Sequence, residues 1–135
     1  MIAPVIALVL LTHLMLIWMY ATRLPAIAQL RMKIDPFGIR GAQMSQLPAR
    51  VRWKTDNYNH LLEQPTLFYA VALSLAVFND HSPASLVLAW AYTLLRVVHS
   101  LVQVTVNSIP VRFSLFVVSS FVLFALTCRA AVLVF

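Results

Sequence analysis

The chain opens with an uncharged apolar run that extends from Met1 to Thr22 and ends at Arg23. At ~1.5 Å of rise per residue, a helix of this length crosses the ~30 Å hydrocarbon core of a bilayer. A cleaved signal peptide would begin with basic residues and would have a shorter apolar segment, so we expect this run to be retained. Of the 135 residues, 61% are hydrophobic and 10% are charged, which is too few charges to cover a small soluble domain. The sequence therefore predicts an integral membrane protein.

Three further apolar runs follow, after one long polar segment. Short connections at 79–83 and 107–110 separate these runs, and short loops make consecutive helices antiparallel neighbours. The predicted helices are about 1–22, 57–78, 84–106 and 112–135, with a loop over 23–56. We therefore expect a single all-α membrane domain over 1–135, built as a four-transmembrane-helix up-and-down bundle.

The loop over 23–56 is strongly basic, with seven Lys or Arg against two Asp. Basic loops mark the cytoplasmic side of membrane proteins and are attracted to anionic lipid. Arg112 bounds the third loop, whereas the second loop has no Lys or Arg. We therefore expect the long loop in the cytoplasm and both termini outside, in the inner membrane if the chain is bacterial. Arg129 is the exception, and its long side chain can reach the outer interface.

Net charge is a poor guide to the partners of this chain. The value of +6 comes largely from the membrane-flanking loop, so it does not indicate binding to nucleic acid. The four His and one Cys show no metal-ligand spacing, and we find neither a Ser-His-Asp arrangement nor a Gly-rich phosphate loop.

Two polar stripes interrupt the apolar runs. Ionisable groups inside a membrane are costly and normally face the bundle interior. On the predicted second helix, extended back into the loop, one face carries Asp56, Asn59, His60 and Glu63. On the predicted third helix, one face carries Arg96, His99, Gln103 and Asn107.

The depths of Glu63 and Arg96 match. Measured from the turn that joins their helices, they lie ~22 and ~18 Å along antiparallel axes, so we expect the two side chains to pair in the core. Such a pair has two explanations that spacing does not separate. It either fixes helix register alone, or, with the surplus polar side chains, it forms a cationic cleft for a small anionic, peptide-like ligand.

The polar residues also resemble a known family. The run from Asn59 to Phe68, the Arg96-Val97-Val98-His99 segment and the Pro110-Val111-Arg112 segment are similar to those of the MAPEG family, the membrane-associated proteins in eicosanoid and glutathione metabolism. The chain resembles a bacterial-type member, similar to microsomal glutathione transferase and prostaglandin E synthase. The resemblance spans nearly the whole chain and implies a homotrimer that binds glutathione between subunits near the cytoplasmic face.

The resemblance also implies roles for individual residues. Arg112 matches the family's thiol-side arginine and is the expected catalytic residue. The residues expected to bind glutathione, as co-substrate, are Asn59, His60, Glu63, Arg96, His99 and Gln103. The chain departs from the family at three positions where hydroxyl side chains occur in members, which here hold Gln103, Phe113 and Phe116.

Two functions remain open at this stage. The first is a membrane-embedded glutathione-dependent transferase or peroxidase acting on lipophilic electrophiles. The second is a non-catalytic membrane binding or scaffold protein of the same family, which the missing hydroxyls favour. A small transporter subunit is a third reading that rests only on intramembrane charge. The expected partners are other copies of the chain, a lipophilic small molecule and membrane lipid.

Overall fold

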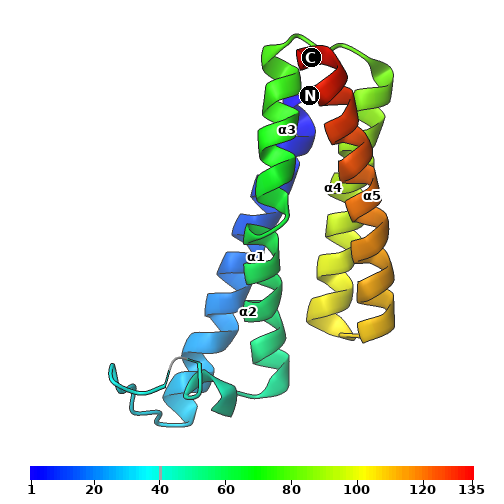
Figure 1. The fold of residues 1–135 in the computed structure, drawn as a ribbon. Helices are drawn as coiled ribbons and strands as arrows, with labels where there is room; N and C mark the ends of the chain where they lie inside the picture. The colour runs from blue at the N-terminus through cyan, green and yellow to red at the C-terminus, as the bar shows by residue number, and fades with distance from the viewer. Residues whose placement is uncertain (40) are drawn as a thin grey trace.

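The fold is all-helical in a computed structural model, which describes residues 1–39 and 41–135. The elements are α1 (Ile2–Gln29), the 3₁₀ helix η1 (Met44–Gln46), α2 (Ala49–Leu62), α3 (Pro65–Val77), α4 (Pro83–Thr105) and α5 (Ile109–Val134). Figure 1 shows that α1 runs beside α2 and α3, which follow one another in line, and that α4 and α5 run side by side. Both termini lie at the end of the molecule opposite the long loop.

The expectation of one helix over 57–78 is wrong, because two helices occupy this part of the chain. Glu63 ends α2 with backbone angles of φ −89° and ψ −96°, outside the helical region. Pro65 then starts α3. A proline inside a helix has no N–H to donate, and its ring clashes with the carbonyl one turn earlier, so the chain breaks just before it. The backbone restarts with a bond from the N–H of Thr66 to the carbonyl of Glu63 at 3.2 Å.

The polar segment between the first two helices is shorter than the expected loop over 23–56. α1 continues past Arg23 to Gln29, and α2 begins at Ala49. Charge ends a membrane-spanning segment but not a helix, because Arg and Lys are good helix formers. Arg40, one of the seven basic residues, lies outside the described residues.

Lys54 shows that this basic segment is partly built into the fold. Its side chain is buried, its Nζ donates to the carbonyl of Arg50 at 2.9 Å, and it lies 5.4 Å from the ring centroid of Trp18 on α1. A cation over an aromatic face is attracted by the ring quadrupole. Lys54 therefore helps to hold α2 against α1.

Three helices are long and apolar enough to cross a membrane: α1, α4 and α5. α3 is apolar but has only 13 residues, or about 20 Å of helix, less than the ~30 Å of hydrocarbon. The chain is therefore an integral membrane protein, and four crossings remain a prediction in which α2 and α3 together form the second.

The apolar core lies where α1, α3, α4 and α5 meet. Its most deeply buried side chains include Leu8, Phe68, Ala72, Leu75, Ala89, Tyr92 and Leu126. The rings of Phe68 and Tyr92 stack, with centroids 4.6 Å apart. Toward the C-terminal end of α4 the buried side chains become polar, and they include Arg96, His99 and Gln103. The fold therefore surrounds one polar stripe on α4.

Arg129 binds the start of α4. Its Nε donates to the hydroxyl of Ser85 at 2.8 Å and its Nη2 donates to the hydroxyl of Ser82 at 3.0 Å. These bonds tie α5 to the turn between α3 and α4, at the same end of the molecule as both termini.

We expect Ser85→Ala to destabilise the protein by roughly 0.5–2 kcal/mol, since it removes a bond between helices and leaves a donor of Arg129 unpaired. Thermal unfolding in detergent measures the loss. Ser45→Ala is the control, because the exposed hydroxyl of Ser45 bonds only within its own loop. Equal effects of the two substitutions would contradict a structural role for the Arg129 contacts.

Candidate functional site

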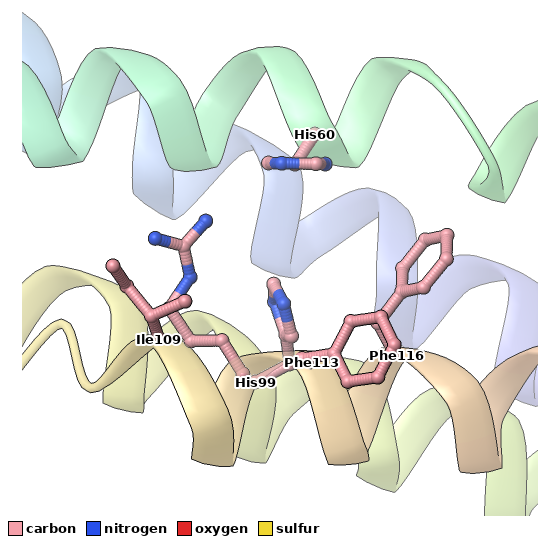
Figure 2. Close-up of a pocket in the computed structure, with 6 residues that line it drawn as sticks. His60, His99, Ile109, Phe113 and Phe116 are labelled. Carbon is pink, nitrogen blue, oxygen red and sulfur yellow. The ribbon is translucent and has the colours of Figure 1, made fainter.

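A cavity of about 260 Å³ lies between α2, α4 and α5. Its lining consists of His60 from α2, His99 from α4, and Ile109, Arg112, Phe113 and Phe116 from α5. Figure 2 shows the two imidazoles facing each other across the space, with the two phenyl rings beside His99. The imidazole centroids are 6.0 Å apart and the rings are inclined at 72°. The cavity therefore combines apolar walls with three nitrogen-bearing side chains.

Arg112 supplies the positive charge of this cavity. It lies in the first turn of α5, after a turn in which Asn107 takes a left-handed conformation (φ 54°) that asparagine tolerates better than most residues. This turn brings Oδ1 of Asn107 to within 2.5 Å of Nη1 of Arg112, which donates to it. When the amide of Gln103 has its oxygen toward Arg112, it accepts from Nη2 at 3.0 Å.

Two properties leave the Arg112 guanidinium available to an anion. Both of these partners are neutral, and its buried Nε has no hydrogen-bond partner among the described residues. A buried donor without a partner costs roughly 1–3 kcal/mol, which an anion in the cavity would offset. The Arg112 end of the cavity is therefore suited to a negatively charged atom.

The predicted pairing of Glu63 with Arg96 is wrong. Arg96 is 1% exposed, but its Nη2 donates to Oε1 of Gln64 and its Nε donates to the hydroxyl of Tyr92 at 3.1 Å. The helix break places Gln64 toward the core, where its Nε2 donates to the hydroxyl of Ser120 at 2.7 Å. The partner of Arg96 therefore lies at the predicted level along the helix, but the break before Pro65 turns Gln64 inward in place of Glu63.

Glu63 instead lies at the surface, where its side chain is 66% exposed. Its Oε2 lies 3.2 Å from Nδ1 of His60, and this is the one contact within 4.0 Å between a carboxylate and a basic side chain in the described part of the chain. His60 thus joins the cavity to an exposed carboxylate. Asn59, the other site residue expected on this helix, is exposed and does not line the cavity.

The six expected site residues other than Arg112 therefore separate into three groups. His60 and His99 line the cavity, and Gln103 reaches it through Arg112. Arg96 is adjacent, since its guanidinium lies 5.6 Å from the ring centroid of Phe116, a lining residue. Glu63 and Asn59 lie outside.

Three residues of this network were not among the predicted site residues: Gln64 and Tyr92, which accept from Arg96, and Ser120, which accepts from Gln64. A signal for Tyr92 was present, because Tyr92, Arg96, His99 and Gln103 follow one face of α4 at i, i+4, i+7 and i+11. Ser120 had no comparable signal, since a serine in an apolar run more often bonds to its own helix, as Ser120 also does through the carbonyl of Phe116.

A helical membrane chain of this length with a polar stripe buried on α4 matches a known family model. The model for the MAPEG family matches residues 1–132, nearly the entire chain. The chain belongs to the MAPEG family. Comparison with curated proteins and with solved structures gave no match.

This MAPEG chain has an apolar wall beside its cationic group. Among the described lining residues none carries a hydroxyl, and Phe113 and Phe116 occupy two of the positions where the resemblance leads us to expect one. Arg112 is consequently the strongest polar group on the α5 side of the cavity.

Proposed function

We propose that the protein is a membrane-embedded, glutathione-dependent transferase or peroxidase that acts on lipophilic electrophiles. The observation that carries this proposal is the Arg112 guanidinium, which faces an apolar-walled cavity without an acidic partner and with an unpaired Nε. Membership of the MAPEG family, which includes glutathione-dependent enzymes, supports it.

When glutathione binds, it supplies a thiol whose sulfur bonds to an electrophilic carbon while the leaving group departs from that carbon. In the peroxidase reaction, two glutathione thiols reduce a hydroperoxide to an alcohol and water and are themselves oxidised to a disulfide. The donor set of this cavity fits such a group, because Arg112 offers an unpaired N–H to a developing negative charge. A cation beside a thiol lowers the thiol pKa and so raises the fraction of the reactive thiolate. Phe113 and Phe116 give this position an apolar wall, and a cation attracts a thiolate more strongly beside apolar groups than in bulk water.

The other polar residues would hold the tripeptide. His99 and His60 line the cavity and can donate to a carboxylate, and Arg96 places a second, buried positive charge behind Phe116. The exposed carboxylate of Glu63 is available to an ammonium group that approaches from outside this chain. We assign Gln103 to orienting Arg112, and Asn59 to a contact at the outer edge of the site.

The direct test measures thiolate formation. We expect purified protein to increase the ultraviolet absorbance of glutathione thiolate near neutral pH, and to consume a generic aryl halide or a lipid hydroperoxide. S-methylglutathione, which cannot ionise at sulfur, is the control. Binding of glutathione without a thiolate signal and without turnover of either substrate would reject the enzymatic proposal.

The apolar wall favours a second candidate, a MAPEG membrane binding or scaffold protein that does not turn over. With Phe113 and Phe116 in place of hydroxyls, thiolate stabilisation rests on a single residue. This candidate predicts ligand binding or protein association with no thiolate signal, so the same absorbance experiment separates the two functions.

We also propose that the chain assembles as a homotrimer with the site at the subunit boundary. Large apolar side chains on α5 remain exposed in the single chain, including Phe113, Phe121 and Phe124. The exposed Glu63 beside the His60 of the cavity supports a ligand shared with a neighbouring subunit.

The mass of the protein in detergent tests this assembly. We expect three copies per particle under conditions that preserve glutathione binding. A particle that contains one chain and still binds glutathione with undiminished affinity would contradict both the trimer and the shared site.

For the orientation of the protein, we propose that the basic loop between α1 and α2 is cytoplasmic and that both termini lie outside. The concentration of Lys and Arg in that loop supports this topology. If the chain is bacterial, the membrane is the inner one.

A further inference from the structure

A second polar cavity lies at the far end of the molecule from the termini. Its volume is about 270 Å³, and its lining comes from the end of α1, the loop and α2. The polar lining residues are Arg23, Arg52, Ser45, Thr55 and Asp56. It shares no lining residue with the cavity around Arg112. The two cavities are therefore distinct.

The two arginines of this second cavity are not used by the fold. Neither guanidinium makes a hydrogen bond within the described part of the chain, and neither has a carboxylate oxygen within 4.0 Å. The contrast with Arg96, Arg112 and Arg129 is clear, because each of those binds neutral side chains. Arg23 and Arg52 thus present two unneutralised cations to one cavity, beside two hydroxyls that can also bind an anion.

The position of the cavity along α1 indicates that it lies at the membrane surface. Arg23 is the first charged residue after the apolar run of α1, so it lies where that helix leaves the hydrocarbon. The neighbouring loop exposes large apolar side chains, with Phe37 at 96% and Ile39 at 82% exposure, close in sequence to Lys33. Exposed apolar side chains interleaved with basic ones are typical of segments that lie on a bilayer surface.

We propose that this second cavity binds the phosphate group of an anionic phospholipid. Arg23 and Arg52 contact the phosphate from α1 and α2, the acyl chains run along the apolar surface of α1, and Phe37 and Ile39 enter the same leaflet. The exposed apolar residues favour a lipid over a free phosphate ion, which would give them no role. Because Asp56 lines the same cavity, it weakens the binding.

The experiment measures the binding of phosphatidylglycerol to delipidated full-length protein by native mass spectrometry in an uncharged detergent. Phosphatidylcholine is the zwitterionic comparison, and inorganic phosphate is the competitor. The test variant carries Arg23→Gln and Arg52→Gln. The matched control carries Arg31→Gln and Lys33→Gln, which remove the same charge from the loop between α1 and α2 but do not line the cavity.

We expect the wild type to prefer phosphatidylglycerol, and the test variant to lose about twenty-fivefold in affinity, at roughly fivefold for each basic residue. The control should bind as the wild type does. Asp56→Asn should bind more tightly, a gain that misfolding would not produce, and Arg23→Lys with Arg52→Lys should retain most of the affinity because the charge remains.

Three outcomes would overturn the proposal. Equal losses in the test and control variants would mean diffuse attraction to the loop. Displacement of the lipid by an equal concentration of inorganic phosphate would mean a site for a soluble ion. A parallel loss of glutathione affinity in the test variant would mean that the cavity serves glutathione.

Discussion

Replacing Arg112 with alanine is expected to abolish glutathione-dependent turnover while leaving glutathione binding measurable. Arg112 is the one lining residue on α5 able to stabilise a thiolate, whereas binding is shared with His60 and His99 on other helices. A one-unit rise in the thiol pKa corresponds to ~1.4 kcal/mol, so the loss at neutral pH should be tenfold or more. The measurement is turnover of an aryl halide or a lipid hydroperoxide, together with glutathione affinity.

Two further variants sharpen this test. Arg112→Lys keeps the charge but not the bonds to both Asn107 and Gln103, so it should recover part of the activity. Arg50→Ala removes an exposed arginine that does not line the cavity, and it should have no effect. Undiminished turnover in Arg112→Ala would remove Arg112 from the mechanism.

The second large effect is expected at Gln64, whose replacement by leucine should destabilise the protein by about 1.5–3 kcal/mol. Gln64 accepts from Arg96 and donates to Ser120, so leucine leaves a buried cation without its strongest acceptor. Thermal or denaturant unfolding in detergent measures the loss. Glu63→Leu is the matched control at the adjacent position, and it should cost far less because Glu63 is exposed.

A double-variant cycle separates this effect from general packing damage. Arg96→Met removes the buried charge, and a cation without a carboxylate partner is expensive to bury, so it should destabilise less than Gln64→Leu does. Combining the two should cost less than the sum, since the stranded charge is then gone. Strict additivity would show that Gln64 does not act through Arg96.

The membrane character and the helices α4 and α5 could be predicted because they follow from long runs with few charges. The end of α1 and the start of α2 could not be predicted in this way. Arg23 and the basic segment before Asn57 mark where the hydrocarbon ends, but the backbone remains helical on both sides of that boundary. Hydropathy locates the bilayer, whereas helix ends depend on caps and proline.

The part of the site that lies on α4 could be predicted from the sequence. The stripe through Arg96, His99 and Gln103 is buried, because a regular helix keeps the spacing of its faces. The partner of Arg96 was not predictable from spacing, since the break before Pro65 changes which residue faces inward. Because of this one proline, Arg96 binds Gln64 and not Glu63, the expected partner.

The interruption between α2 and α3 has a consequence for how the two helices can be oriented. In a continuous helix, the direction of every side chain is fixed relative to every other, at ~100° per residue. Here the two helices keep separate angular registers, so α2 alone sets the direction of His60 toward its cavity, and α3 independently buries the face that carries Phe68, Ala72 and Leu75. A substitution that rotates α3 slightly against the core should therefore leave the orientation of His60 unchanged.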